Sequence, residues 1–246
     1  MKPLWQGVLS GVVAYLFFMV VTAPAVKVLP LVQPEGVRAT GVDGTLWSGR
    51  AARVAVPAVQ LTDVRWRFRP LALFIGQVRF AIEGSLQGQR IEADAGSSFL
   101  GKPRASDVRG RMAASELLKL PGLQQVRLDG MLDFDISEVE WPDSGYPAVA
   151  GTVVWSGARV GAPYELELGK MQLETRIEDG VTRGTLKNEG GALLLQADVE
   201  MNSSGAYRLN ARLQQKGDVP QAVTGFLTTF AEYKDGTYIL EWSDSI

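Results

Sequence analysis

The sequence contains neither cysteine nor histidine among its 246 residues. Without cysteine the chain has no disulfide, no thiol nucleophile and no thiolate metal site. Without histidine it has no Ser-His-Asp triad, no imidazole acid or base and no histidine-bound zinc. Most hydrolase mechanisms are therefore excluded. An oxidising compartment stays open, because a domain of this size does not depend on disulfides for its stability.

The sequence also lacks a strong net charge. At −2 overall, it generates no global field that would attract nucleic acid, and we expect no nucleic-acid partner. The charge is unevenly distributed, however. Residues 26–112 carry 13 Lys and Arg against 7 Asp and Glu, a net charge of +6, whereas residues 113–246 carry 11 against 20, a net charge of −9. The molecule is expected to be dipolar, with its basic part near the N-terminus.

Charged residues are absent from the N-terminal stretch between Pro3 and Val26. As a helix, this stretch would extend about 36 Å, enough to cross a hydrocarbon core of about 30 Å. It is longer than the core of a signal peptide, about 7–15 residues, which favours an uncleaved transmembrane anchor over residues 1–27. The small-x-small string Ala23-Pro24-Ala25 keeps a cleavable signal open as the alternative.

The orientation of this anchor follows from its flanking charges. Lys2 precedes the apolar run, and positive residues are retained on the cytoplasmic side of a membrane. We therefore expect a cytoplasmic N-terminus and a large domain beyond the membrane. Pro24, Pro30 and Pro34 are predicted to end the helix and to stiffen a linker over residues 28–36.

From Val37 onward, apolar and polar residues alternate with a period of two. The pattern is clear in residues 64–68, 126–136 and 193–201. One apolar and one polar face on strand after strand indicate an antiparallel sheet, here of some ten strands. Two-residue motifs of a polar residue followed by glycine, which are typical of hairpin turns, separate the strands: Glu83-Gly84, Asp129-Gly130, Asp179-Gly180, Ser204-Gly205 and Asp235-Gly236. The short spacing between these pairs leaves no room for crossover helices.

Two helices are predicted within this β-rich region. The first covers residues 113–120 and is closed by Pro121-Gly122. The second covers residues 218–230, with Asp218 as its N-cap and Gln221 three residues later. The two helices offer narrow apolar stripes to the sheet, formed by Leu117, Leu118 and Leu120 and by Val223, Phe226, Leu227 and Phe230.

A short motif occurs twice in the chain. Residues 44–49 read Gly-Thr-Leu-Trp-Ser-Gly and residues 151–157 read Gly-Thr-Val-Val-Trp-Ser-Gly, which places Trp47 and Trp155 108 positions apart. Gly76 and Gly184 repeat at the same offset. This periodicity predicts two tandem β-rich repeats, residues 37–122 and 123–246, each with a short helix. Both tryptophans are expected to be largely buried in equivalent places.

Two charged clusters are the strongest candidates for a site. Arg65, Arg67 and Arg69 project from one side of a predicted strand, either towards anionic lipid head groups or an acidic partner, or simply into solvent, the reading we prefer. The second cluster is acidic and contains no basic residue: Asp129, Asp133, Asp135, Glu138, Glu140 and Asp143.

The acidic cluster does not have the surroundings of an active site. Asp133 and Asp135 would place their carboxylates about 6.6 Å apart, a separation that suits an inverting glycosidase. Alternation places both on the wet face, without the apolar pocket that raises the pKa of a catalytic acid. The glycine of a calcium-binding loop is missing as well. We therefore predict no catalytic, cofactor-binding or metal-binding residue, and no enzyme activity.

The order of these motifs resembles type II secretion system protein N (general secretion pathway protein N). After the apolar N-terminus come Gly44 to Ala51, then Leu61 to Trp66 leading to Pro70-Leu71 and Gly76, and then Pro147 and Gly151 to Trp155, before a closing helix and an Asp-Gly hairpin. The resemblance covers nearly the whole chain. It implies a single-pass inner-membrane protein with a periplasmic β-domain, which docks other secretion subunits and supports protein export across the outer membrane.

A second functional class stays open. An anchored, repetitive sheet with one apolar face is also similar to the AsmA-like envelope proteins, which carry or shield acyl chains, and this makes phospholipid an alternative partner. A closed apolar face would favour docking of protein subunits. An open apolar face would favour lipid, because a large exposed apolar surface calls for a ligand.

Overall fold

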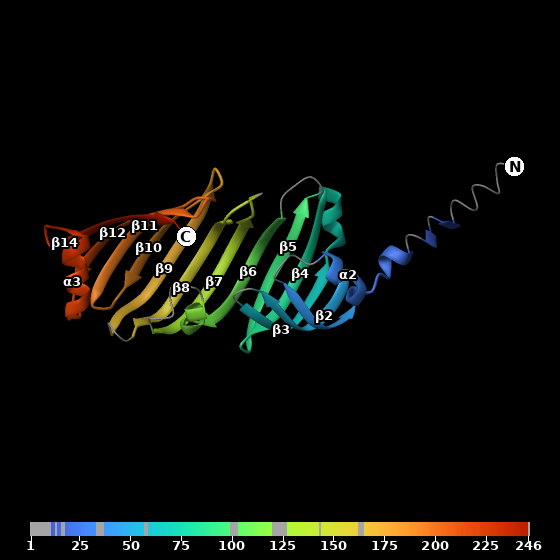
Figure 1. Ribbon diagram of the computed structural model, residues 1–246, viewed down its shortest axis with the longest axis horizontal. Coiled ribbons are helices and arrows are strands. Elements are labelled where there is room, and N and C mark those ends of the chain that lie inside the picture. The colour runs from blue at the N-terminus through green and yellow to red at the C-terminus, as the bar shows by residue number, and fades with distance from the viewer. Residues whose placement is uncertain are drawn as a thin grey trace.

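The computed structural model places most of the chain in one long curved β-sheet (Figure 1). It describes residues 11–12, 14–15, 18–32, 37–56, 59–98, 103–119, 127–142, 144–161 and 165–245. Helix α2 (Ala25–Val32) lies at one end of the sheet and helix α3 (Gln221–Phe230) at the other. Two short 3₁₀ helices, η1 (Pro70–Ile75) and η2 (Ala114–Lys119), connect strands.

Fourteen strands of the described residues form this single sheet, and every pair of neighbours is antiparallel. The mainly β, antiparallel class is confirmed. The strands are β1 (Arg38–Gly44), β2 (Ser48–Val56), β3 (Val59–Phe68), β4 (Gln77–Leu86), β5 (Gln89–Ser98), β6 (Pro103–Ala113), β7 (Leu128–Glu140), β8 (Ala148–Val160), β9 (Leu166–Glu178), β10 (Val181–Glu189), β11 (Leu193–Met201), β12 (Ala206–Gln215), β13 (Glu232–Lys234) and β14 (Thr237–Ser245).

The spatial order of the strands follows the chain from β1 to β12, and β14 then precedes β13. Strands β6 and β7 pair along nine residues, across the predicted boundary at residue 122, so the sheet continues from one predicted repeat into the next. The division into two repeats stays a prediction, because a continuous sheet can be assembled from two repeats as well as from one.

Three of the five predicted hairpin turns are confirmed. Asp179-Gly180 and Asp235-Gly236 connect adjacent strands, and all four residues have positive φ angles, as tight primed turns require. Ser204-Gly205 lies in the turn between β11 and β12. The prediction was wrong for Glu83-Gly84, inside β4, and Asp129-Gly130, inside β7.

These two glycines serve packing within strands instead of chain reversal. A Cβ atom on Gly84 would lie 3.3 Å from a methyl group of Val64 on the neighbouring strand. Gly130 has a φ angle of 111° at a bulge opposite β8, where a Cβ atom would lie 2.6 Å from the carbonyl oxygen of Gly157. Glycine inside a strand often marks such close approach, which a two-residue motif cannot distinguish from a turn.

Both predicted helices occur in modified form. Strand β6 extends to Ala113 and the following helix, η2, is a 3₁₀ helix; Leu120 and Pro121-Gly122 lie outside the described residues. Helix α3 starts at Gln221, and its N-cap is Pro220 without a side-chain hydrogen bond, so the capping role predicted for Asp218 was wrong. Proline fits this position because its φ of −52° is within the range that the proline ring allows.

The N-terminal region differs from the expected stiff linker. Pro30 lies inside α2, so residues 25–32 are helical, whereas Pro34 lies outside the described residues. Pro24 forms an isolated β-bridge with Thr45. Residues 18–21 are helical, but no helix within the described ranges is both long and apolar enough to span a bilayer. Nearly half of the predicted anchor, residues 1–10, 13, 16 and 17, falls outside those ranges.

The sheet is a single layer with little cover. A compact protein of 26.7 kDa would expose roughly 10,700 Å². This chain exposes 16179 Å². Among the described residues, none with a large side chain is less than 2% exposed. The chain therefore leaves much more surface for contact with other molecules than a compact protein of its size.

Candidate functional site

The predicted alternation divides the sheet into two chemically different faces. On β3, Val64 is buried and Trp66 and Phe68 are half-buried, whereas Arg65 and Arg67 between them are exposed. Cross-strand pairing continues the apolar side from strand to strand, because directly opposite residues share a face. We call this side the apolar face; it includes Val64, Trp66, Phe68, Phe80, Ile82, Ile91, Val108, Phe134, Ile136, Val139, Val153, Leu173, Leu186, Val199 and Leu209.

Helical cover of the apolar face is local. Around η2, Leu117 and Leu118 pack near Leu128 and Leu132. Around α3, Val223 packs with the buried Leu227 against strands β11, β12 and β14. Between these two clusters, apolar-face residues such as Phe134 and Leu173 are only half-buried. In the part of the chain that the structure describes, the apolar face is therefore open along its middle.

The apolar stripe of α3 is narrower than the sequence predicted. Phe226 and Phe230 are 45% and 53% exposed, although both were expected to face the sheet. Their rings contact each other, with centroids 4.8 Å apart, and Phe230 also approaches Trp242 at the edge of the sheet. Helix α3 thus covers the end of the apolar face with one row of side chains and leaves its second row exposed.

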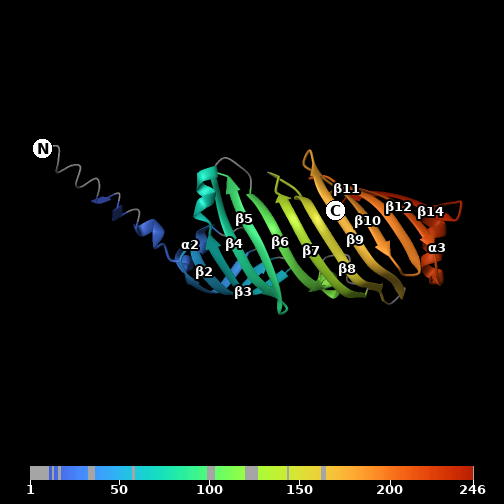
Figure 2. The same cartoon turned by 180° about the vertical axis from the view of Figure 1, so that it is seen from behind.

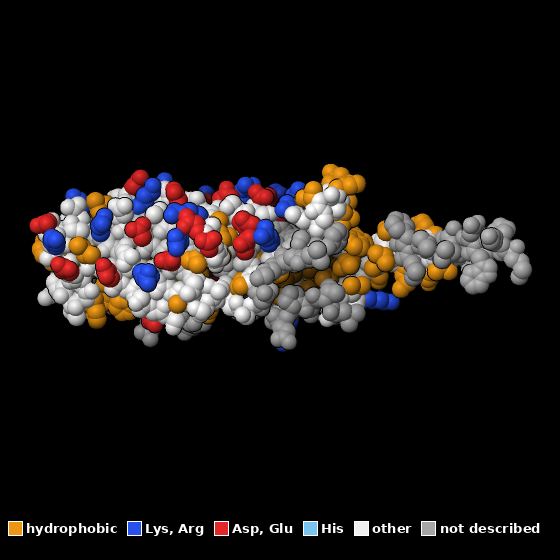
Figure 3. All heavy atoms as spheres, turned by 90° about the horizontal axis from the view of Figure 1, so that it is seen from above, with side chains coloured by type: hydrophobic (Ala, Val, Ile, Leu, Met, Phe, Trp, Pro, Cys, Tyr) orange, Lys and Arg blue, Asp and Glu red, His pale blue; other side chains and the backbone are white. Residues whose placement is uncertain are grey.

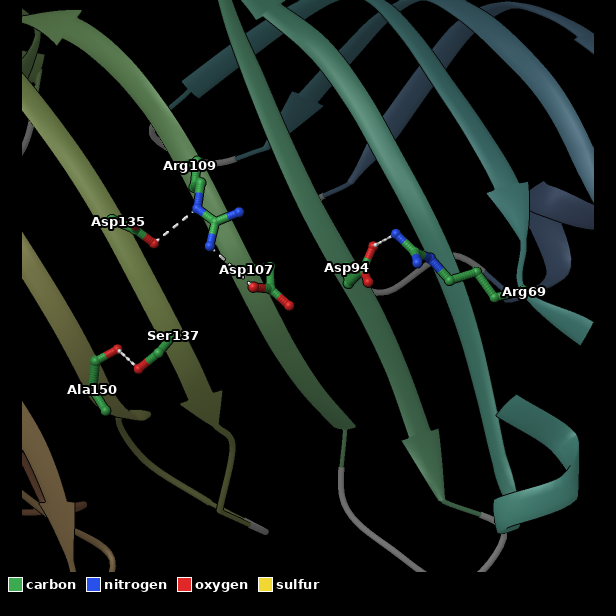
Figure 4. A network of polar contacts seen from close by, with 7 residues as sticks. All are labelled: Arg69, Asp94, Asp107, Arg109, Asp135, Ser137 and Ala150. Carbon is green, nitrogen blue, oxygen red and sulfur yellow. Dashed lines mark hydrogen bonds and ion pairs between the residues drawn. The ribbon is translucent and has the colours of Figure 1, made fainter. Parts of the chain in front are cut away.

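The opposite face carries a ladder of arginine–carboxylate pairs. Arg111 on β6 pairs with Asp133 on β7. Arg109 on β6 pairs with Asp135 on β7 at 3.1 Å (Figure 4). Arg104 pairs with Glu138 at 3.4 Å and with Glu140 at 2.6 Å. Arg127 approaches Asp129 at 3.6 Å. Asp143 lies outside the described residues. Figure 3 shows charged side chains of both signs along this side of the molecule.

The arginine–carboxylate ladder accounts for the acidic cluster without a catalytic role or a bound metal ion. The carboxylates of Asp133 and Asp135 each pair with a guanidinium on the neighbouring strand β6. The described residues also contain no group of three or more metal-ligating side chains. The cluster has the geometry of a solvated strand face, and the arginines that neutralise it come mainly from a neighbouring strand.

Three pKa values are displaced along the ladders, all at exposed positions. The hydrogen bond from Arg109 to Asp135 raises the pKa of that arginine. The hydrogen bond from Arg176 lowers the pKa of Glu178, and Arg183 adds to this effect at 2.9 Å. The charge of Glu200 raises the pKa of Arg183. Each displacement stabilises an ion pair and holds the group further from the pKa that acid–base catalysis would need.

The three arginines that were predicted on one strand are not equivalent: Arg65 and Arg67 lie on β3, whereas Arg69 follows it. Arg69 pairs with Asp94 on β5 at 2.8 Å (Figure 4). Arg65 and Arg67 form no ion pair with any residue that the structure describes. Their end of the polar face is consequently more positive than the central ladders, in agreement with the uneven distribution of charge along the sequence.

Trp47 lies where the N-terminal helix meets the sheet. Its indole Nε1 donates a hydrogen bond of 2.8 Å to the carbonyl oxygen of Val20. The amide of Leu46 donates to the carbonyl oxygen of Ala23 at 2.9 Å. Carbonyl groups at a helix C-terminus lack partners within the helix, and these two donors provide partners from the sheet. The Val20 oxygen also accepts a hydrogen bond of 3.3 Å from the amide of Ala23. We call this set of contacts the helix clamp.

A second tryptophan, Trp66, contacts the residues that form the helix clamp. Trp66 Nε1 donates to the carbonyl oxygen of Leu46 at 3.0 Å. Its ring lies over Gly49, where a Cβ atom would be only 2.4 Å from the indole. The ring of Trp47 contacts Phe68 with a centroid distance of 4.9 Å, and Phe68 contacts Phe80 at 5.4 Å. The aromatic residues thus link the helix end to the apolar face.

The two repeated tryptophans do not occupy equivalent places, contrary to the sequence prediction. Trp47 lies in the bend between β1 and β2, whereas Trp155 lies inside β8. Trp155 Nε1 donates a hydrogen bond of 2.9 Å to the backbone carbonyl oxygen of Asp129 on the adjacent strand. Both rings are half-buried instead of largely buried. The second motif has one extra residue and lies in a strand whose pairing contains a bulge. Similar sequences therefore have different local structures in the two places.

The family of the chain follows from comparison with known proteins. A model of the family described as "Type II secretion system (T2SS), protein N" matches residues 35–240. The chain belongs to the type II secretion system protein N family. The match covers the sheet from before β1 into β14, and the resemblance noted in the sequence is confirmed.

Individual relatives agree with this result. The type II secretion system protein N of Vibrio cholerae is 28% identical over 215 residues, 83% of this chain and 83% of the relative. That of Aeromonas hydrophila is 29% identical over 221 residues, 85% and 84% of the two chains. That of Pectobacterium carotovorum is 25% identical over 232 residues, 91% of each. No solved structure matches the chain.

Sequence reasoning missed the helix clamp and the exposure of η1. The signals were present: Trp47 lies between the two glycines of the repeated motif, and Pro70 to Ile75 is an uncharged apolar string directly after three alternating arginines. Neither the helix clamp nor the exposure of η1 can be deduced from the spacing of residues within one helix or strand. Both depend on which distant segments become neighbours, and this could not be deduced from alternation alone.

Proposed function

We propose that this protein is a non-enzymatic inner-membrane component of the type II secretion pathway, in which residues 1–27 tether a periplasmic β-domain that docks other secretion subunits. The N-terminus lies in the cytoplasm and the sheet in the periplasm. Family membership supports the assignment to the secretion apparatus. The helix clamp is the structural observation that supports the tether.

The helix clamp gives the tether a mechanical role. A flexible linker would let the domain move freely relative to the membrane. Here the acceptors for Trp47 Nε1 and for the Leu46 amide lie on Val20 and Ala23, within the apolar run. Cleavage after Ala25 would remove both acceptors, and Ala25 itself is fully buried. These contacts favour the uncleaved anchor over the cleaved signal peptide.

A single-layer sheet suits a docking component. Its polar face is long, and its charge changes from the unpaired arginines of β3 to the paired ladders of β6 to β12. Such variation of charge gives specificity to partner surfaces and increases the rate of their association. The carboxylates of the central ladder are paired with arginine, which supports binding instead of catalysis.

The secretion role is tested by deleting the gene in the organism that carries it. We expect the amounts of secreted enzymes in the culture fluid to fall, with the enzymes active but retained in the periplasm. Expression of the full chain should restore secretion, whereas a chain whose residues 1–27 are exchanged for a cleavable signal peptide should not. Unchanged enzyme levels in the culture fluid of the deletion strain would refute the proposal.

A second candidate function is lipid handling by the AsmA-like mode, and the open middle of the apolar face favours it. Half-buried side chains such as Phe134 and Leu173 form a continuous apolar surface between the clusters of η2 and α3. An apolar surface that is left partly exposed in this way is a candidate site for an apolar ligand. A phospholipid acyl chain has the apolar chemistry to occupy it.

The lipid candidate is tested by photo-crosslinking in intact cells. A photoreactive phenylalanine in place of Phe134 should form an adduct with phospholipid, detected by mass spectrometry of the purified full chain. The matched control is Val154 on the adjacent strand, which pairs with Asp133 on the polar face. Adducts at neither position, or equally at both, would refute lipid binding by the apolar face.

A further inference from the structure

Among the described residues of the β-domain, helix η1 presents the most exposed large apolar side chains. Leu71 is 77% exposed, Phe74 87% and Ile75 67%, and only Ala72 of this helix is buried. Gly76 ends the helix in the left-handed conformation, and its amide donates to the carbonyl oxygen of Leu73 at 3.0 Å, so the side chains are held outward by a tight turn. A cluster of this kind marks a surface that contacts another apolar phase.

Basic residues flank η1 on both connecting strands. No acidic residue occurs between Asp63 and Glu83. Arg67 precedes η1 and Arg79 follows it, and neither forms an ion pair with the described residues. The backbone amide of Arg69 donates to the carbonyl oxygen of Arg79 at 2.8 Å, which closes the base of η1. Apolar side chains therefore project from a cationic base.

The helix clamp places η1 beside the end of the proposed anchor. Trp47 donates to Val20, and the carbonyl oxygen of Trp47 accepts a hydrogen bond of 2.7 Å from the amide of Phe68. Helix η1 begins only two residues after Phe68, at Pro70. Helix η1 also lies at the same end of the sheet as α2 in both ribbon views (Figures 1 and 2).

These positions put η1 at the depth of the membrane surface. A helix over residues 3–22 would be about 30 Å long, the thickness of the hydrocarbon core, so that Val20 lies near its periplasmic boundary. Trp47, bound to Val20, is then at the level where tryptophan is enriched in membrane proteins. Helix η1 follows directly from the residues that pack against Trp47.

We propose that η1 is a second membrane contact, whose residues Leu71, Phe74 and Ile75 enter the periplasmic leaflet while Arg67 and Arg79 bind the head groups of anionic phospholipids. This inference rests on the proposed tether. An apolar cluster on a cationic base has the chemistry of interfacial membrane segments, which are buried about 5–10 Å into the boundary of head groups and acyl chains. Two contacts instead of one fix the orientation of the sheet relative to the bilayer.

The experiment uses the absence of native cysteine. Single-cysteine variants of the full chain, Phe74→Cys, Phe226→Cys and Met19→Cys, are labelled with an environment-sensitive fluorophore and reconstituted in vesicles of phosphatidylethanolamine and phosphatidylglycerol. A fraction of the lipids carries a nitroxide quencher on the acyl chain. We expect roughly twofold quenching or more at Phe74→Cys, because an interfacial segment reaches the acyl chains. Phe226 is the matched control, an exposed phenylalanine at the far end of the sheet.

The outcomes separate this inference from the tether. Quenching at Met19→Cys together with no quenching at Phe74→Cys would overturn the role of η1 and leave the tether intact. No quenching at either position would overturn both. Protection of the Phe74→Cys label from water only after other secretion subunits are added would assign η1 to a protein partner and overturn the lipid assignment.

A charge variant tests the head-group contacts. In the Phe74→Cys background, Arg67→Gln and Arg79→Gln together should reduce quenching in phosphatidylglycerol-containing vesicles to the level found in vesicles of phosphatidylcholine alone. The exposed Arg208, in the C-terminal part of the polar face, provides the control substitution Arg208→Gln, which should leave quenching unchanged. Equal quenching in all variants and both lipid compositions would overturn the contribution of the two arginines.

Discussion

Trp47 and Val20 are joined by a hydrogen bond of 2.8 Å between the indole nitrogen and a backbone carbonyl oxygen, across 27 positions of the chain. The bond connects the C-terminal end of the apolar helix to the first hairpin of the sheet. It supports the proposed tether, because it holds the helix end against the sheet; the same carbonyl oxygen also accepts a longer hydrogen bond of 3.3 Å from the amide of Ala23.

The first prediction concerns this bond. Trp47→Phe keeps an aromatic ring next to Phe68 but removes the donor to Val20. We expect a loss of about 1 kcal/mol, typical of one hydrogen bond, and correspondingly faster limited proteolysis at residues 22–25. Trp141→Phe, at a tryptophan that is 37% exposed, is the control and should leave the proteolysis rate unchanged. Equal rates for the two variants would show that the bond does not hold the helix end.

Gly49 allows the close approach of Trp66. The Gly49→Ala variant would place a methyl group 2.4 Å from the indole ring and 2.7 Å from the carbonyl oxygen of Asp43. We expect a loss of about 1–3 kcal/mol in the free energy of unfolding, because both neighbours must move. Urea unfolding followed by tryptophan fluorescence measures this difference.

The control for Gly49 is Gly225, in helix α3. A Cβ atom there would meet nothing within 4 Å. Gly225→Ala should therefore stabilise the protein, by about 0.5–1 kcal/mol, because alanine is the better helix former. If both alanine variants change stability in the same direction, crowding by Trp66 is not the reason for the glycine.

Each ion pair of the arginine ladder should contribute little to the free energy of unfolding, and the ladder should not depend on a metal ion. Arg111→Gln breaks the exposed pair with Asp133, and we expect a loss of less than about 1 kcal/mol with normal secretion. Calcium chloride or EDTA should leave the Tm of the wild-type chain unchanged. A calcium-dependent rise in Tm that disappears in Asp133→Asn would contradict the assignment of this cluster to ion pairs.

Glu178 should make a small contribution to acid sensitivity. Its pKa is lowered from the ordinary value of 4.5 by the hydrogen bond from Arg176, so the ionised form is favoured in the folded state. The contribution to stability is complete above pH 4.5 and is lost as the pH falls through the folded-state pKa. Glu178→Gln should therefore flatten the decrease of stability in this acidic range, measured by urea unfolding at a series of pH values. An unchanged pH profile would show that the pair is not maintained in solution.

The sequence by itself determined the chemistry of the two faces. The alternation of Val64, Trp66 and Phe68 with Arg65 and Arg67 is a local property with a period of two, and pairing preserves it wherever the strand is placed. The antiparallel class, the turns at residues 179–180 and 235–236 and the family could be deduced for the same reason. Each depends on residues that are close in the sequence or on the order of motifs along it.

Only the tertiary structure decided which distant residues meet. Register between β6 and β7 brings Arg109 opposite Asp135, which turns an apparently unpaired acidic cluster into a ladder. The same dependence on neighbours separates Trp47 from Trp155 and keeps Gly84 inside a strand. The openness of the apolar face is likewise a property of what covers it. Alternation along the sequence specifies which side chains lie on a given face, whereas register and topology decide which distant residues they meet. The hydrogen bond from Trp47 to Val20 depends on both.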